Sequence, residues 1–276
     1  MDDRPRVLGV PIDPVDLDGL LDRVAVLVDG GRAATVCYVN AHVLDVSTRD
    51  PGLVHFLRTA DLCYCDGRGV VLGARLLGHH LPGRLTGADW IHDLAARSID
   101  EGWRLAWVGG EPGVTADAAR QLEARHSGLD IVHTDHGFRL APDLAVLNSA
   151  RPDIVLVGMG TPLQERWVRW YRAGIEAPVV WCVGATADFV SGRLRRGPDW
   201  LSRDHEWMAR LVVEPRRLWR RYLVGNPRFL LRVLDLIRNR TRGSGPHGTQ
   251  PGPAEDCCRL HGQPGSQGCA TRQGAE

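Results

Sequence analysis

Residues 34–66 read ATVCYVNAHVLDVSTRDPGLVHFLRTADLCYCD, and this stretch sets the expected fold. Its two ends, 34–40 and 61–66, are short apolar runs rich in β-branched and aromatic residues, as is typical of buried strands. The runs end at polar residues, Asn40 and Asp66. Two such runs separated by a helix-length segment predict parallel strands joined by a crossover connection.

The same alternation continues along most of the chain. Amphipathic patterns over 17–31 and 113–128 predict helices. We therefore expect an α/β fold: a Rossmann-like, mostly parallel sheet with helices on both faces. Ligands of such sheets collect at the carboxyl ends of the strands. Four further strands are predicted, at 104–110, 129–135, 153–160 and 179–185, and the polar or glycine residues expected at that edge are Asn40, Asp66, Gly109, Gly110 and Gly160.

The composition changes after Gly192, which divides the chain into three expected parts. Residues 1–192 form the α/β core, and 193–242 form an Arg-rich helical appendage with 14 arginines against five acidic residues. Residues 243–276 are rich in Gly, Pro, Gln and Ser, which predicts a disordered tail. The last helix of the appendage carries an apolar stripe made of Phe229, Leu230, Val233, Leu234 and Ile237.

Composition and charge narrow the function classes. The 276 residues carry a net charge of only +1, so no global signal points to nucleic acid. The start of the sequence does not have the pattern of a signal peptide, and no run is long and apolar enough for a membrane span. We expect a cytoplasmic protein with peripheral membrane contact. Four cysteines lie in the predicted strands, as buried reduced thiols would: Cys37, Cys63, Cys65 and Cys182.

Asp66 is the first candidate for chemistry. It follows a buried strand and precedes Gly67, so its carboxylate is expected at the ligand-binding edge of the sheet. A carboxylate there can accept the proton of an attacking hydroxyl group. On spacing alone, an Asp-Gly turn or a helix N-cap explains the same residues.

One glycine-rich loop and one acidic pair complete the motifs of the core. Gly109 and Gly110 begin a loop that leads into a helix, whose N–H groups could hold a diphosphate. The spacing is not that of a dinucleotide fingerprint, and a plain strand-to-helix turn explains it equally well. Asp16 and Asp18 resemble a metal-binding pair, but they open a predicted helix. We therefore predict no metal site.

The arginines of the appendage form a possible anion site. Arg210, Arg217 and Arg220 fall on one helix face if Pro215 rotates the chain little. Guanidinium groups facing one way suit diphosphates or phospholipid head groups. A solvated basic face is the alternative.

Seven segments occur in order along the chain: VNAHVLDVSTRDP, ADLCYCDGRGVV, GRLTGADW, VGGEPGV, PDIVLVGMGTPLQE, VGATADFVSGRLRRGPDW and HEWMARLVVEPRRLWRRYL. Over roughly residues 7–224 they resemble the family of bacterial glycosyltransferases that includes the N-acetylmannosaminyl-type transferases of wall teichoic acid and enterobacterial common antigen synthesis.

The resemblance implies an inverting, metal-independent hexosyltransferase without a cofactor. It would move N-acetylmannosamine or a related hexose from a UDP-sugar to a polyprenyl-diphosphate-linked sugar at the anionic inner membrane surface. The implied roles are Asp66 as catalytic base, Asn40 as sugar contact, Arg84 as donor or sugar contact, Gln164 as pocket residue, and Arg210, Arg217 and Arg220 as a clamp on the donor diphosphate.

The chain departs from the family pattern beside Asn40. Tyr38 stands where the family usually has Thr, and a phenol there would reshape the pocket around the sugar. Two other functions compete with the resemblance. One is a nucleic-acid-binding or modifying protein with a basic arm, which the net acidic remainder of the chain opposes. The other is a catalytically silent scaffold, which the presence of Asn40, Asp66, Arg84 and Gln164 together opposes.

Overall fold

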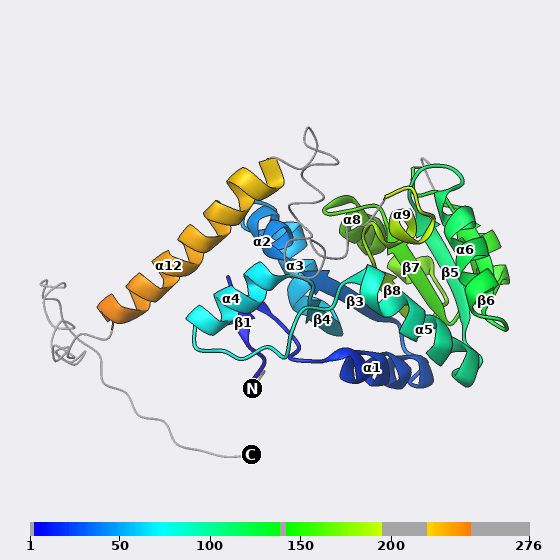
Figure 1. The fold of residues 1–276 in the computed structure, drawn as a ribbon, viewed down its shortest axis with the longest axis horizontal. Coiled ribbons are helices and arrows are strands. Elements are labelled where there is room, and N and C mark those ends of the chain that lie inside the picture. Colours follow the sequence, from blue (N-terminus) through cyan, green and yellow to red (C-terminus); the bar gives the residue numbers. More distant parts are fainter. Residues whose placement is uncertain (1–2, 139–141, 195–219, 244–276) are drawn as a thin grey trace, which may run out of the picture. The chain divides into compact units, whose positions relative to one another are not determined.

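The computed structural model describes residues 3–138, 142–194 and 220–243. Its centre is a six-stranded, fully parallel sheet of order β4-β3-β8-β7-β5-β6 (Figure 1). The strands are β3 (Ala34–Val39), β4 (Leu62–Cys65), β5 (Arg104–Gly109), β6 (Asp130–Asp135), β7 (Ile154–Gly158) and β8 (Val179–Cys182). All six predicted strands and the α/β fold class are confirmed.

Helices connect the strands, as the alternating pattern predicted. They are α1 (Leu17–Asp29), α2 (Ala41–Ser47), α3 (Pro51–Thr59), α4 (Arg68–Leu76), α5 (Gly87–Glu101), α6 (Val114–Arg125), α7 (Leu144–Ser149), α8 (Leu163–Tyr171) and α9 (Thr186–Val190). A 3-10 turn η1 (Arg172–Gly174) follows α8, and a π-helical segment η2 (Arg220–Gly225) precedes α12 (Asn226–Gly243). A small antiparallel hairpin, β1 (Arg6–Val7) with β2 (Val10–Pro11), precedes α1.

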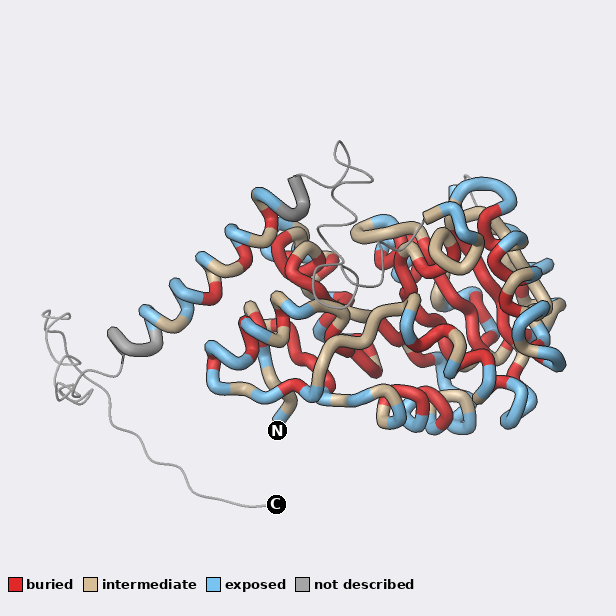
Figure 2. The backbone as a smooth tube through the Cα atoms, viewed as in Figure 1, coloured by how far each residue is buried: buried red, intermediate tan, exposed pale blue. Residues whose placement is uncertain are grey.

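The two faces of the sheet carry separate apolar clusters. One cluster joins the sheet to α2, α3, α4, α8 and α12, and the other joins it to α1, α5, α6 and α9. Every residue of β4, β7 and β8 is buried, which explains their continuous apolar runs (Figure 2). The edge strand β6 is partly exposed and has a more polar sequence. The four predicted reduced thiols are free and buried, as expected.

A group of aromatic rings fills the second cluster. Trp90 of α5 stacks on Trp181 of β8 with ring centroids 4.3 Å apart. Tyr64 of β4 meets Trp181 edge-on, and the Trp181 indole N–H donates to the Tyr64 hydroxyl over 3.3 Å. These contacts fix α5 on the sheet close to the carboxyl ends of β4 and β8.

Helix α12 packs on the opposite cluster. Phe229 is 1% exposed and Val233 is 0% exposed, and both lie against Gly73 of α4, where a Cβ atom would stand 2.8 Å from the Phe229 ring. Arg232 forms an ion pair with the buried Asp45 of α2. Phe229 and Val233 therefore pack against the rest of the protein, with Leu230 and Ile237 partly buried beside them. Leu234 is the exposed member of the predicted apolar stripe.

Contacts divide the chain into a unit from Met1 to Asn239 and a second unit from Arg240 to Glu276. The structure describes the second unit only as far as Gly243, in the last turn of α12. No helix within 3–138, 142–194 or 220–243 is long and apolar enough to cross a membrane.

Candidate active site

The structure places Asn40 and Asp66 side by side at the carboxyl edge of the sheet. Asn40 follows β3 and caps α2, because its side-chain oxygen accepts the Val43 N–H over 3.0 Å. Its amide nitrogen donates to Asp66 Oδ2 over 3.2 Å. Asp66 directly follows β4, and its own N–H donates to the Val39 carbonyl over 2.8 Å. One side chain therefore both begins a helix and orients the predicted base.

Gly67 permits this approach. A Cβ atom at Gly67 would stand 3.1 Å from the Asn40 Cβ, tighter than ordinary van der Waals contact. Its backbone is extended, so the glycine is needed for space and not for an unusual dihedral angle. The Asp-Gly pair that reads as a turn in the sequence thus lets two strand ends come together, with Gly67 as the N-cap of α4.

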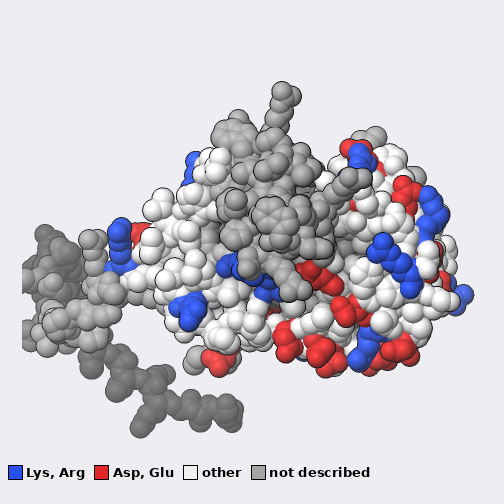
Figure 3. All heavy atoms as spheres, viewed as in Figure 1, with Lys and Arg blue, Asp and Glu red and all other residues white. Residues whose placement is uncertain are grey.

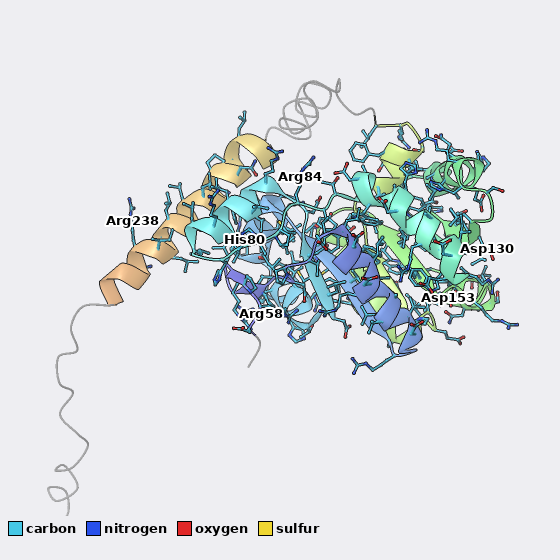
Figure 4. The ribbon with its side chains drawn as sticks, turned by 60° about the horizontal axis from the view of Figure 1, so that its bottom comes forward. Arg58, His80, Arg84, Asp130, Asp153 and Arg238 are labelled. Carbon is cyan, nitrogen blue, oxygen red and sulfur yellow. The ribbon has the colours of Figure 1, made fainter. Side chains whose placement is uncertain are left out.

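Arg84 lies on the connection between α4 and α5 (Figure 4). The next residue, Leu85, donates its N–H to the carbonyl of Cys65 over 2.8 Å, which ties the connection to the end of β4. The Arg84 side chain is 24% exposed and lies 3.9 Å from Asp89 in the first turn of α5. Arg84 is therefore held near Asp66 by a backbone hydrogen bond one residue away.

Gln164 joins three strands at the same edge. Its Oε1 accepts the Gly184 N–H over 3.0 Å after β8, and its Nε2 lies 3.4 Å from the Tyr38 hydroxyl on β3. Gln164 itself lies in the first turn of α8, after β7, and is fully buried. Gly184 has a positive φ of 61°, and a Cβ there would stand 2.6 Å from the Tyr38 hydroxyl oxygen. The phenol that departs from the family pattern thus occupies the space beside Gly184.

The glycine loop after β5 packs backbone to backbone. Gly109 has φ of 139°, and a Cβ there would lie 2.1 Å from the Gly158 carbonyl oxygen on β7. Gly110 donates its N–H to that same carbonyl over 2.9 Å. Gly113 then begins α6 without a side-chain cap, and Glu111 forms an ion pair with Arg193. The strand ends of β5 and β7 are therefore held closer than any side chain would allow.

The acidic pair before α1 has a structural role. Asp16 is the N-cap of α1, and its carboxylate accepts the Gly19 N–H over 2.9 Å. This confirms the helix-start interpretation. In the described part of the chain no group of three or more His, Cys, Asp or Glu side chains could hold a metal ion.

Residues 5–243 match the model of the glycosyl transferase WecG/TagA/CpsF family. The chain belongs to this family. It is 29% identical over 212 residues to the N-acetylglucosaminyldiphosphoundecaprenol N-acetyl-beta-D-mannosaminyltransferase of Bacillus spizizenii, covering 75% of this chain and 80% of that protein. The Bacillus subtilis protein of the same name is 27% identical over 216 residues, or 77% of this chain and 84% of its own length.

Membership of the WecG/TagA/CpsF family confirms the resemblance and makes the chain a glycosyltransferase. It gives no support to the nucleic-acid alternative. Of the residues to which the sequence assigned a site role, the structure brings together Asn40 with Asp66, holds Arg84 close by, and places Gln164, Gly109 and Gly110 along the same strand ends. Arg210 and Arg217 lie outside the described residues, and Arg220 begins η2 with a side chain that is not described.

One buried group of this glycosyltransferase was not anticipated. Glu165 is 1% exposed, and its Oε1 accepts hydrogen bonds from the Thr161 hydroxyl (2.7 Å) and the Gln164 amide (2.9 Å). Burial raises the pKa of this carboxyl group, although both hydrogen bonds partly offset the effect. Its second oxygen has no partner among the described residues. The sequence signal is a polar Gln-Glu pair in a first helical turn, which usually faces solvent.

Proposed function

We propose that this glycosyltransferase moves N-acetylmannosamine, or a related hexose, from a UDP-sugar to a polyprenyl-diphosphate-linked sugar. The observation that carries the proposal is the Asn40–Asp66 hydrogen bond at the carboxyl edge of the sheet. The two Bacillus relatives support the substrate class, because their names specify an undecaprenyl-diphosphate-linked acceptor and an N-acetylmannosaminyl group.

The reaction assigned to this site is a single displacement. Asp66 accepts the proton of the acceptor hydroxyl, whose oxygen attacks the anomeric carbon of the donor sugar. The bond from that carbon to the UDP oxygen breaks, and UDP leaves with the electron pair. Attack from the opposite face inverts the anomeric configuration. The Asn40 amide holds one Asp66 oxygen in place, so that the carboxylate is oriented before substrate arrives.

The donor diphosphate is assigned to the glycine loop and to the appendage arginines. Gly109 and Gly110 lead into the loop before α6, and the N–H groups at the start of that helix favour anions. Arg210, Arg217 and Arg220 are proposed to close over the diphosphate and to neutralise the leaving UDP without a metal. The cap role of Asp16 at the start of α1 supports this metal-independent assignment.

Membrane contact is assigned to the outer side of α12, at the cytoplasmic face of the membrane. Leu231, Leu234 and Leu236 are 64%, 42% and 37% exposed on this helix. In the face shown in Figure 3, acidic side chains gather over α1 and the start of α5, away from α12. Exposed leucines on a helix suit insertion into the interface of a leaflet.

A panel of UDP-sugars tests the proposal. The full chain is incubated with each donor and a short-chain lipid-diphosphate-N-acetylglucosamine acceptor, with and without EDTA. We expect one extended lipid product, detected by mass spectrometry, with inverted anomeric configuration by NMR and unchanged yield under chelation. No product with any donor would reject the substrate class. Loss under EDTA with recovery on adding Mn²⁺ would reject the metal-independent mechanism.

Tyr38 is the residue to vary for donor choice. Its hydroxyl lies beside Gln164 and Gly184, and the family pattern places the smaller Thr there. Tyr38→Thr is expected to change which UDP-sugar gives the highest kcat/KM in the same panel. An unchanged order of donors would show that Tyr38 does not face the sugar.

A further inference from the structure

A groove of about 830 Å³ runs along α2, with α8 on one side and the η2–α12 junction on the other. We call it the α2–α8–α12 groove. His42, Arg49, Pro162, Arg166, Val224 and Arg228 are among its lining residues. Its volume lies within the range of about 300–1,000 Å³ that is usual for ligand sites.

One end of this groove lies at the first turn of α2, the helix that begins after Asn40. His42 lies in the first turn of α2, which Asn40 caps, and Pro162 lies two residues before the buried Gln164. The other end lies at Arg49, between α2 and α3. A ligand lying along α2 would therefore have one end at His42, two residues after the helix cap Asn40.

The charges of the groove favour an anion. Its two carboxylates are already paired, because Asp45 binds Arg49 and Arg232 while Asp50 binds Arg166 over 2.9 Å. The Arg166 hydrogen bond lowers the pKa of Asp50, which keeps this carboxylate ionised.

Arg228 adds a further guanidinium group to this lining. No ion pair joins it to a carboxylate within the stretches that the structure describes. A guanidinium group has five N–H donors, so Arg49 and Arg166, about half-exposed, keep donors for a ligand. The groove therefore presents more positive than negative charge, and guanidinium groups are strong hydrogen-bond donors to phosphate oxygens.

Apolar side chains lie between these charges. Val46, Pro51, Pro162 and Val224 contribute to the lining. The occupant should therefore combine a doubly charged phosphate group with hydrocarbon. This combination differs from a nucleotide, which would require a flat surface for its base and partners for its ribose.

We infer that the α2–α8–α12 groove binds the diphosphate and the first isoprene units of the lipid-linked acceptor, with Arg228 as the principal phosphate contact. The inference rests on the proposed function and assigns its second substrate to a surface that is separate from the glycine loop after β5. The acceptor sugar then projects from the His42 end toward Asp66, while the lipid leaves along α12, whose outer leucines are exposed.

Arg228→Gln in the full chain tests this assignment, with Arg238→Gln as matched control because Arg238 is also exposed on α12 but does not line the groove. Two soluble acceptors are compared: the short-chain lipid-diphosphate-sugar and an alkyl glycoside of the same sugar without phosphates. Arg228→Gln should raise KM for the diphosphate acceptor about 10-fold or more, the loss expected for one hydrogen bond to a charged group. It should change KM for the alkyl glycoside and for the UDP-sugar less than about twofold, and Arg238→Gln should change none of them.

Equal effects on both acceptors, or an effect on the UDP-sugar alone, would overturn the assignment while leaving the transferase function intact. A binding measurement tests the groove assignment independently of the proposed transferase function. Geranyl diphosphate, titrated by calorimetry with UDP saturating, should bind wild type and Arg238→Gln and bind Arg228→Gln at least about 10-fold more weakly. If binding weakens in this way but no sugar is transferred, the groove assignment stands and the proposed function is rejected. If Arg228→Gln binds geranyl diphosphate as well as wild type does, the groove assignment is rejected.

Discussion

The amide of Asn40 donates to a carboxylate oxygen of Asp66 over 3.2 Å, although the two residues are 26 positions apart in the chain. The parallel pairing of β3 with β4 produces this proximity, because it aligns Val39 with Cys65 at the ends of the two strands. The residue after each strand is then brought to the same point. The pair can therefore be tested one member at a time.

Asp66→Asn should lower turnover by about 10²–10⁴ while leaving the fold and the affinity for UDP unchanged. An amide of the same shape cannot accept the proton of the attacking hydroxyl. Steady-state rates and the shift in melting temperature with UDP measure the two properties separately. A variant with more than half of the wild-type rate would remove Asp66 from the role of base.

Asn40 has two roles, and two substitutions separate them. Asn40→Ala removes both the cap of α2 and the contact to Asp66, so stability should fall by about 1 kcal/mol and turnover should fall as well. Asn40→Ser keeps an oxygen that can cap α2 but loses the amide donor. It should retain wild-type stability in urea and lose as much turnover as Asn40→Ala. A fully active Ser variant would show that the amide does not position the carboxylate.

Gly109→Ala should destabilise the protein by about 3 kcal/mol or more. The added methyl group would meet the Gly158 carbonyl oxygen, which belongs to backbone and cannot rotate away. Gly102 provides the control, because its φ of 70° is also positive but nothing lies within 4 Å of a Cβ there. Gly102→Ala should cost only the left-handed strain, about 1–2 kcal/mol. Equal unfolding free energies for the two variants would contradict the close packing of β5 and β7.

Glu165 should make stability fall as pH rises. Its folded-state pKa is raised above 4.5, so its contribution to stability is fully present below pH 4.5 and is lost as the pH rises through the folded-state pKa. Glu165→Gln cannot titrate. The melting temperature of wild type should therefore drop relative to Glu165→Gln between pH 4.5 and alkaline pH. A constant difference across that range would mean that burial does not perturb the carboxyl group.

Exposed and buried residues of α12 should behave differently. Replacing Leu231 and Leu234 together by Ser should weaken binding to anionic liposomes and leave activity on a water-soluble acceptor within about twofold, because both side chains are exposed. Phe229→Ala removes a buried ring and should cost about 3–5 kcal/mol of stability. Liposome co-sedimentation and chemical unfolding report the two effects. Undiminished sedimentation of the double variant would move the membrane surface elsewhere.

The sequence was sufficient for the sheet because its strands, apart from the more polar edge strand β6, are short apolar runs followed closely by a glycine or polar residue. The hairpin of β1 and β2 escaped prediction, since two-residue strands leave no periodicity to detect. Asp66 could be predicted as a site residue because a carboxylate directly after a buried parallel strand must lie at the carboxyl edge of the sheet. Gln164 became a candidate only through the family resemblance, because its contacts to Tyr38 and Gly184 join residues 126 and 20 positions away.

The apolar stripe of α12 shows what an amphipathic pattern leaves undetermined. Phe229 and Val233 predict one apolar side, but helical spacing does not specify whether lipid or protein covers it. In the structure this apolar side packs on α4, where Gly73 has no side chain that would clash with Phe229. Glu165 shows the opposite error. Its polar local sequence predicts exposure to solvent, but the turn at Thr161 and the neighbouring strands bury it.

The packing of α12 also bears on the order in which the enzyme is completed. Helices α2 and α4, which begin beside Asn40 and Asp66, lie within residues 41–76, whereas the Phe229 and Val233 side chains that pack on this cluster belong to the last described helix. A chain emerging from the ribosome therefore presents its sheet and the proposed base Asp66 long before α12 has been synthesised. The apolar surface around Gly73 is therefore exposed until α12 has been made, and the helices that begin at Asn40 and Gly67 reach their final packing only after that point.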